Sequence, residues 1–207
     1  MPLDHHHEEQ EALVIENEAG NIEAHIMVDA LQEVLIRKGL LTAHEVTAAI
    51  AKLESPGVHL GAKVVAKAWI DTEYKQCLVS DGRAAVQELG IPVTETSVIV
   101  VENTPTKLNL IICTLCSCYP CSILGQPPSW HISKAYRARS VREPCRLMAE
   151  FGLDLPMDAQ LVVHDSNANM RYLVLPEPPS GPGTCGVSNL ESLISRDHLI
   201  GVARAVV

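Results

Sequence analysis

Four cysteines within nine residues are the side chains best suited to chemistry: Cys113, Cys116, Cys118 and Cys121. Cysteines this close in sequence do not make the disulfide framework of a secreted protein, because a disulfide holds its two Cα atoms at a restricted separation. In a reducing compartment such a cluster of thiols is more typical of a metal site. The sequence therefore predicts a metal bound by sulfur.

The spacing of the cluster is compatible with two kinds of metal site. A structural zinc site would use all four sulfurs in a tetrahedron, although the single residue between Cys116 and Cys118 is short for adjacent corners. In the second geometry, the sulfurs of Cys116 and Cys118 and the backbone nitrogens of Ser117 and Cys118 form a square plane, with Cys113 as the axial ligand. The sixth position is then open to water or substrate, and the deprotonated amides require a trivalent metal. The first site would be structural and the second catalytic.

The composition excludes several classes of protein. At 207 residues the chain is long enough for one domain plus an arm, and its net charge of −9 argues against a nucleic-acid surface. No run approaches the ~18 apolar residues that a membrane span needs. Residues 1–9 have neither the basic start nor the apolar stretch of a secretory signal. We expect a cytoplasmic protein that binds neither nucleic acid nor membrane.

The first 90 residues carry mainly helical patterns. Residues 1–20 are acidic, contain three histidines and show little periodicity, which predicts a flexible arm. Residues 21–90 form an N-terminal helical region, in which Thr42 and Glu45 have the spacing of a capping box. The predicted helices are Ile22–Gly39, Thr42–Leu53 and His59–Trp69, and Asp71 is the expected N-cap of a fourth.

Residues 91–207 carry β-branched runs separated by turn signals, and we assign them to a metal-binding α/β layered domain. Prolines and a glycine after the cysteine cluster predict a loop that lasts until a helix at residues 142–151. The predicted strands are Ser97–Val101, Leu108–Ile112, Gln160–His164, Arg171–Leu175 and Leu199–Ala203, with a short helix at Leu190–Ser195. These elements predict an α+β fold, with an N-terminal helical arm followed by a layered α-β-β-α domain.

The stretch from Ile112 to Tyr119, Ile-Cys-Thr-Leu-Cys-Ser-Cys-Tyr, resembles the metal-binding motif of nitrile hydratase α subunits. Thr114 and Tyr119 are similar to the cobalt form of that family rather than the iron form. Further segments stand in the order and spacing of the family: His59–Trp69, Val101–Pro105, Ile123–Trp130, Tyr136–Pro144, Arg171–Pro176 and Leu199–Ala203. Together they extend the resemblance over about residues 30–204.

The resemblance implies a non-corrin Co(III) centre rather than the Fe(III) form. Its metal ligands would be Cys113, Cys116, Ser117 and Cys118, with Cys116 oxidised to a sulfinic acid and Cys118 to a sulfenic acid. The implied reaction is the hydration of a nitrile to the corresponding amide, a hydro-lyase activity. Cys118, Ser117 and Cys116 would be the catalytic residues: the nucleophile is either a metal-activated hydroxide or the sulfenate oxygen of Cys118, and Ser117 orients the plane.

The resemblance also implies partners for this chain. A separate β subunit would form a heterodimer with it and supply arginines that hold the oxidised sulfurs. A small nitrile would be the substrate, and an activator protein would insert the cobalt.

Two alternative functions remain open. Cys121 stands where nitrile hydratases commonly carry a tryptophan, and the γ subunit of thiocyanate hydrolase, a close relative, also lacks that tryptophan and carries the Ile-Leu-Gly-Gln found here at residues 123–126. The chain would then belong to an enzyme that converts thiocyanate to carbonyl sulfide and ammonia. The other alternative is a metal-binding module without catalytic activity.

Overall fold

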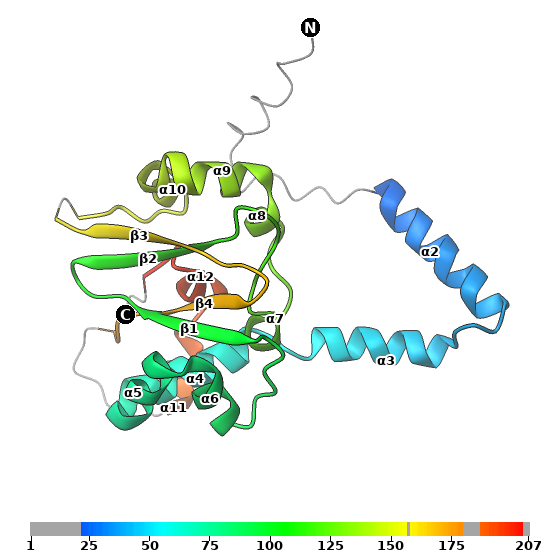
Figure 1. Cartoon of the computed structure of the whole chain (residues 1–207), viewed down its shortest axis with the longest axis horizontal. Coiled ribbons are helices and arrows are strands. Elements are labelled where there is room, and N and C mark those ends of the chain that lie inside the picture. The colour runs from blue at the N-terminus through cyan, green and yellow to red at the C-terminus, as the bar shows by residue number, and fades with distance from the viewer. Residues whose placement is uncertain (1–21, 157, 180–186, 205–207) are drawn as a thin grey trace, which may run out of the picture.

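The computed structural model describes residues 22–156, 158–179 and 187–204, and its body has four layers (Figure 1). The arm predicted for residues 1–20 lies outside the described residues. Helices cover both outer sides of the body, and two pairs of strands lie between them. The predicted α-β-β-α arrangement is therefore confirmed.

The layers are built from elements that are distant in sequence. One helical layer contains α4 (Val58–Ile70), α5 (Thr72–Ser80) and α6 (Gly82–Glu88), and the other contains α9 (Lys134–Arg142) and α10 (Pro144–Glu150). The strands are β1 (Ser97–Glu102), β2 (Lys107–Ile112), β3 (Gln160–Asp165) and β4 (Met170–Leu175). Helices α5 and α6 contact β1, whereas α9 contacts β2 and α10 contacts β3.

Each strand pairs in parallel with a strand far along the chain. β1 pairs with β4, starting at Ser97 opposite Met170, and β2 pairs with β3, ending at Ile112 opposite Asp165. β1 and β2, which follow one another in sequence, are therefore in different sheets, and so are β3 and β4. Because parallel strands end at the same edge, the segment that leaves β2 begins beside the end of β3.

Two N-terminal helices extend away from the body (Figure 1). They are α2 (Ile22–Arg37) and α3 (Ala43–Glu54), and neither contains a buried residue. The predicted capping box is confirmed: the Thr42 hydroxyl accepts from the Glu45 amide at 3.1 Å, and the Thr42 amide donates to the Glu45 carboxylate at 2.8 Å. We refer to α2 and α3 together as the helical arm.

The helical arm exposes large apolar side chains. In α2, Ile26 is 63% exposed, Met27 73% and Leu31 57%, and in α3 Leu53 is 60% exposed. A contiguous apolar surface of this kind is typical of a site that another molecule covers. None of the described helices is long and apolar enough to cross a membrane.

The segment after the cysteine cluster is more helical than predicted. It contains α7 (Cys121–Leu124) and α8 (Ser129–Ile132), and α9 begins at Lys134, well before residue 142. The Ser133 hydroxyl caps α9 by accepting a hydrogen bond from the Tyr136 amide at 3.0 Å. Pro120 and Pro128 are the N-caps of α7 and α8, so the prolines here precede short helices and do not keep the whole segment extended.

The predicted final strand, Leu199–Ala203, is wrong. Leu199 and Ile200 end α12 (Arg196–Ile200), which follows α11 (Val187–Ser192), and residues 201–203 form a turn and a bend. The Ser195 amide donates to Nδ1 of His198 at 2.8 Å, which closes the first turn of α12. A short apolar run such as Leu199-Ile200 fits a buried helix as well as a strand, so the pattern alone does not separate them.

Gly201 ends α12 directly against strand β2. Its φ is +93°, in the left-handed region, and an added Cβ would lie 1.8 Å from the carbonyl oxygen of Asn109. Asn109 is fully buried, and its amide nitrogen donates to the Glu102 carbonyl at 2.8 Å and to the Asn103 side chain at 2.9 Å. The end of α12 therefore holds β2, the strand that leads into the cysteine cluster.

Replacing Gly201 by alanine should strongly destabilise the fold, because the new methyl group has no room against Asn109. We expect Gly201→Ala to lower the free energy of unfolding by roughly 3 kcal/mol or more, from overpacking and the positive φ together. The matched control is Gly90→Ala, which has a φ of +75° but no atom within 4 Å of the added Cβ. It should cost only about 1 kcal/mol in urea denaturation; equal losses for the two variants would contradict the close packing.

Candidate metal centre

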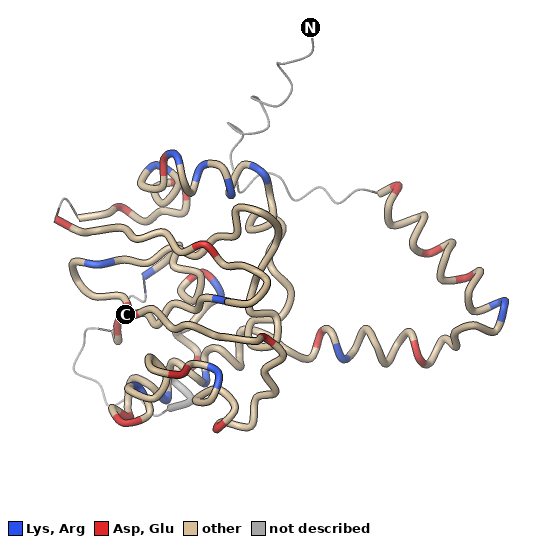
Figure 2. The backbone as a smooth tube through the Cα atoms, in the orientation of Figure 1, with Lys and Arg blue, Asp and Glu red and all other residues tan. Residues whose placement is uncertain are grey.

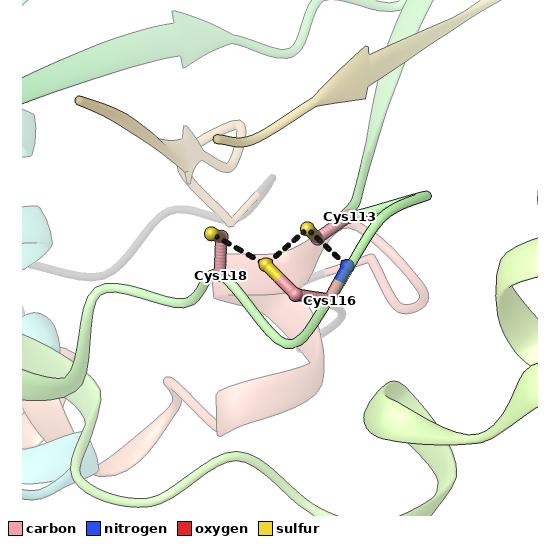
Figure 3. Close-up of side chains that lie close together, drawn as sticks. All are labelled: Cys113, Cys116 and Cys118. Carbon is pink, nitrogen blue, oxygen red and sulfur yellow. Dashed lines mark hydrogen bonds between the residues drawn. The ribbon is translucent and has the colours of Figure 1, made fainter. Parts of the chain in front are cut away.

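Three cysteine sulfurs come together in the loop that follows β2 (Figure 3). The Sγ atoms of Cys113 and Cys116 are 3.3 Å apart, those of Cys116 and Cys118 are 3.0 Å apart, and all three lie within 4.8 Å of one another. Cys113 and Cys118 are buried, whereas Cys116 and the intervening Ser117 are exposed. One side of the cluster therefore faces the core and the other faces solvent.

The fourth cysteine of the sequence cluster is not part of this group. Cys121 begins α7 and is partly buried, and the set of donors within 4.8 Å contains Cys113, Cys116 and Cys118 without it. A tetrahedral zinc site built from all four sulfurs does not fit this arrangement.

The two cysteines on either side of Ser117 have opposite electrostatic environments. Hydrogen bonding with the Cys118 and Cys113 sulfurs lowers the pKa of Cys116, and the backbone N–H groups of Cys118 and Ser117 lower it further. Burial raises the pKa of Cys118 to about 12, and its contacts with the other two sulfurs raise it as well. Without a bound cation, Cys116 is therefore the more acidic thiol of the pair.

The donors present fit a thiophilic transition metal. The three sulfurs already lie together, and the backbone N–H groups of Ser117 and Cys118 contribute to the lowered pKa of Cys116. The three sulfurs are therefore close enough to share one ion, with the backbone nitrogens of Ser117 and Cys118 as further candidate ligands. Thiolate donors of this kind select soft or strongly Lewis-acidic transition metals over magnesium or calcium.

Asp165 fixes the start of the metal loop. Its carboxylate accepts from the Thr114 amide at 2.9 Å and from the Thr114 hydroxyl at 2.5 Å. The parallel pairing of β2 with β3 creates this contact, because Ile112 and Asp165 are opposite each other at the ends of their strands. The sequence identified Asp165 only as a turn residue, and no local pattern indicated that it would hold the metal loop.

An aromatic group lies directly behind the metal loop. The ring of His131 is 5.1 Å from that of Tyr119 and 5.2 Å from that of Tyr136, and Tyr136 donates to the Ile111 carbonyl at 2.7 Å. His131 is 1% exposed, and burial lowers the pKa of its imidazole to about 4, although the backbone of Cys118 acts in the opposite direction. The imidazole is therefore neutral near pH 7 and packs as an aromatic ring, a role that the sequence did not indicate.

Arg171 brings positive charge to the buried side of the cluster. It belongs to β4, and its Nε and Nη1 atoms are buried without a hydrogen-bond partner among the described residues. Its charge lowers the pKa of both Cys118 and Cys121, although burial raises each of them more. The sequence marked Arg171 as the start of a strand and gave it no part in the site.

The fold and the cluster define a class of protein: a layered α/β subunit that presents a three-sulfur metal site in a loop at the end of a strand. Comparison with known proteins places it more narrowly. The family model described as nitrile hydratase, alpha chain, matches residues 22–203, and the chain belongs to this family.

Individual relatives agree with this assignment. The chain is 42% identical over 185 residues to the low-molecular weight cobalt-containing nitrile hydratase subunit alpha of Rhodococcus rhodochrous, covering 88% of this chain and 89% of that protein. It is 39% identical to the thiocyanate hydrolase subunit gamma of Thiobacillus thioparus, covering 86% of this chain and 78% of the relative. A solved double mutant of the Fe-type nitrile hydratase from Comamonas testosteroni Ni1 matches with a TM-score of 0.83 and 39% identity, over 91% of this chain and 93% of that one.

Removing the Asp165 carboxylate should weaken metal binding, because Thr114 and the loop behind it lose their fixed position. We expect Asp165→Ala to lower the affinity for cobalt by about 10- to 100-fold, as is typical when an outer partner of a metal site is lost. Competition with a chelator measures the affinity. Asp154→Ala is the control, because this side chain is exposed and forms no hydrogen bond or ion pair with the residues that the structure describes; equal affinities for the two variants would refute the role of Asp165.

In the metal-free protein, iodoacetamide should modify Cys116 well before Cys118 at near-neutral pH. Cys116 is exposed with a lowered pKa, whereas Cys118 is buried with a raised one, and the thiolate is the reactive form. Peptide mass spectrometry over time gives the order of modification. Cys77 and Cys145, which are exposed and distant from the cluster, serve as references within the same sample. Faster modification of Cys118 would contradict the electrostatics described above.

Proposed function

We propose that this chain is the metal-bearing catalytic subunit of a nitrile hydratase, which hydrates a nitrile to the corresponding amide. The observation that carries the proposal is the three-sulfur cluster, with Cys116 and Cys118 on either side of Ser117, in a chain of the nitrile hydratase α family. A structural metal site would have all its ligands closed in by protein. Here Cys116 is exposed, which leaves access for a substrate on the solvent side.

The metal ligands in this proposal are Cys113, Cys116, Ser117 and Cys118, with Ser117 and Cys118 contributing their backbone nitrogens. We assign the metal as Co(III) in preference to Fe(III), because a relative with 42% identity is named as cobalt-containing. When bound, such an ion supplies Lewis acidity that polarises the carbon of a nitrile. Cys116 and Ser117 are exposed at the face that a substrate would approach, and the Cys118 sulfur lies 3.0 Å from that of Cys116, so these three are the proposed catalytic residues.

We further propose that an external oxidant such as dioxygen converts Cys116 to a sulfinic acid, a four-electron oxidation, and Cys118 to a sulfenic acid, a two-electron oxidation. The exposure and lowered pKa of Cys116 favour its oxidation, since susceptibility follows thiolate character and access. Cys118 is buried and its pKa is raised, so its oxidation would require that metal binding first remove its proton. The deeper oxidation of the exposed cysteine is consistent with this order.

A partner subunit is part of the proposal. The apolar residues of the helical arm are exposed in the isolated chain, as expected of a surface that a β subunit covers. The same partner would face the exposed side of Cys116 and supply the arginines that hold the oxidised sulfurs. We place the αβ heterodimer in the cytoplasm, where cysteines remain reduced until an activator protein inserts the cobalt.

Thiocyanate hydrolysis is the second candidate function. The chain is 39% identical to the thiocyanate hydrolase subunit gamma of Thiobacillus thioparus, close to its identity with the nitrile hydratase subunit. In addition, Cys121 puts a small side chain, at the start of α7, where nitrile hydratases commonly have a tryptophan. This substitution bears on the shape of the pocket, so the substrate has to be determined by experiment.

The decisive experiment is turnover by this chain, produced together with a β subunit in cobalt-supplemented medium, with a small nitrile and thiocyanate offered side by side. We expect the amide. Carbonyl sulfide and ammonia from thiocyanate would instead support the hydrolase, and neither product from a fully loaded complex would leave only a metal-binding module.

Loss of a ligand sulfur should abolish turnover without loss of the fold. We expect Cys118→Ala to lower the rate by more than about a hundredfold, because even outer partners of metal sites are worth 10- to 100-fold. Cys145→Ala, an exposed position in α10, should leave the rate unchanged. Cobalt content, measured in both purified variants, separates loss of metal from loss of chemistry.

A further inference from the structure

Ser122 ties the far end of the metal loop to a carboxylate outside it. The metal loop, residues 113–120, ends where α7 begins. The Ser122 amide donates to Oε1 of Glu95 at 3.0 Å, and the Ser122 hydroxyl donates to Oε2 of the same carboxylate. Ser122 is buried, so its side of both contacts is shielded from water. Hydrogen bonds to a charged group are among the stronger ones in a protein.

The first turn of α7 leaves the Ser122 amide in need of an acceptor. The amides of Ile123 and Leu124 donate to the Pro120 carbonyl at 3.1 and 2.9 Å, whereas that of Ser122 donates to Glu95. Pro120, the N-cap of α7, provides no side-chain cap. The carboxylate of Glu95 therefore caps α7 from a distant part of the chain.

Glu95 is itself anchored in the body. It stands two residues before β1 begins, and the alternate residues Ile91 and Val93 that precede it are buried. Asp165, which holds the start of the metal loop, ends β3, and β3 belongs to the other pair of strands. The metal loop is thus tied to both sheets, at its start through β3 and at its end through the segment before β1.

The two carboxylates make the same pattern of contacts. Each accepts from one backbone amide and from the hydroxyl of the same residue, Thr114 at the start of the loop and Ser122 after its end. Figure 2 shows Asp and Glu spread along the described chain, so Glu95 and Asp165 act as individual contacts and not as one acidic patch. Together they limit where the two ends of the loop can lie.

Only a short connection separates Ser122 from the metal ligands. Tyr119 and Pro120, which follow Cys118, are buried, and the Cys121 amide donates to the Tyr119 carbonyl at 2.8 Å. The ring of Pro120 also fixes its own φ. A displacement of Ser122 is therefore passed on to Cys118 and is not absorbed by a flexible linker.

Glu95 also acts on the cysteine outside the three-sulfur cluster. Burial raises the pKa of Cys121, and the charge of Glu95 raises it further, although Arg171 lowers it. Because the thiolate is the form that binds metals, Glu95 disfavours Cys121 as a fourth sulfur ligand.

We propose that Glu95 is a positioning residue of the metal centre, which fixes the end of the metal loop through Ser122 as Asp165 fixes its start through Thr114. The inference rests on the proposed function, which places the catalytic metal in this loop. Since Glu95 acts through Ser122, its loss should change the geometry of the sulfur ligands and not only the stability of the fold.

The test is the cobalt affinity of this chain produced together with a β subunit, measured by competition with a chelator. We expect Glu95→Ala to lower the affinity about tenfold or more, as is typical for outer partners of metal sites. The matched control is Asp81→Ala, which removes a carboxylate–amide hydrogen bond of 3.0 Å at the start of α6 and should leave the affinity unchanged. Equal affinities for the two variants would overturn the proposal.

A spectroscopic signal separates positioning from a general loss of stability. The sulfur-to-cobalt charge-transfer absorption of the loaded complex depends on the geometry of the sulfur ligands. It should shift in Glu95→Ala and stay unchanged in Asp81→Ala, even if the two variants lose similar free energies of unfolding. An unshifted band in Glu95→Ala would contradict the positioning role.

A double-mutant cycle tests the contact itself. Ser122→Ala should lower the cobalt affinity about threefold when Glu95 is present, the worth of one hydrogen bond, and should have no further effect in the Glu95→Ala background. The same loss in both backgrounds would refute the contact as the route of the effect. If Glu95→Ala does not unfold cooperatively, Glu95→Gln takes its place in each comparison, because it keeps the shape and one acceptor oxygen; it should cost about threefold.

The readout also separates this proposal from the proposed function, because affinity is measured without any substrate. Affinity that depends on Glu95, in a complex that turns over neither nitrile nor thiocyanate, would support the positioning role and reject the enzyme. Nitrile turnover by the wild-type complex, with a cobalt affinity that ignores Glu95, would do the opposite.

Discussion

The parallel pairing of β2 with β3 is the constraint on which the metal centre depends. It sets the end of β3 beside the segment that leaves β2, so that Asp165 holds Thr114 through two hydrogen bonds. The core supports this edge from behind: Tyr136 binds the carbonyl of Ile111, and the end of α12 lies against the backbone of Asn109. The backbone at the start of the cysteine loop is therefore held in place, which a loop without these contacts would not be.

Burial divides the three sulfurs into two kinds. Cys113 and Cys118 face the packed interior, where the aromatic rings behind the loop exclude water, while Cys116 faces outward. Burial raises the pKa of Cys118, whereas hydrogen bonds with the neighbouring sulfurs and backbone lower the pKa of Cys116. A single short loop thus contains one thiol that is open to reagents and another that is protected until an ion arrives, which is an asymmetry that an ordered oxidation needs.

Local patterns predicted the parts of this protein that local chemistry determines. The sequence alone predicted the capping box at Thr42, the N-cap Asp71 and the cysteine cluster, because each depends on residues a few positions apart. The contacts of Asp165 and Arg171 with the site depend on strands that bring together residues more than 50 positions apart, and His131 reaches the site from a separate helix, α8; periodicity encodes neither arrangement. The prediction of a final strand was wrong for a related reason, since the burial of Leu199 and Ile200 is compatible with either a helix or a strand.

The helical arm has a consequence for the order in which the complex forms. Because α2 and α3 have no buried residues, their apolar surface is accessible to a partner even before the body folds. They also precede the metal loop in the chain, so a ribosome exposes them before Cys113 has been synthesised. A partner that binds this surface can therefore capture the nascent chain early. If the proposed β subunit is that partner, a cell that made too little of it would leave the apolar side chains of the arm exposed, which favours aggregation.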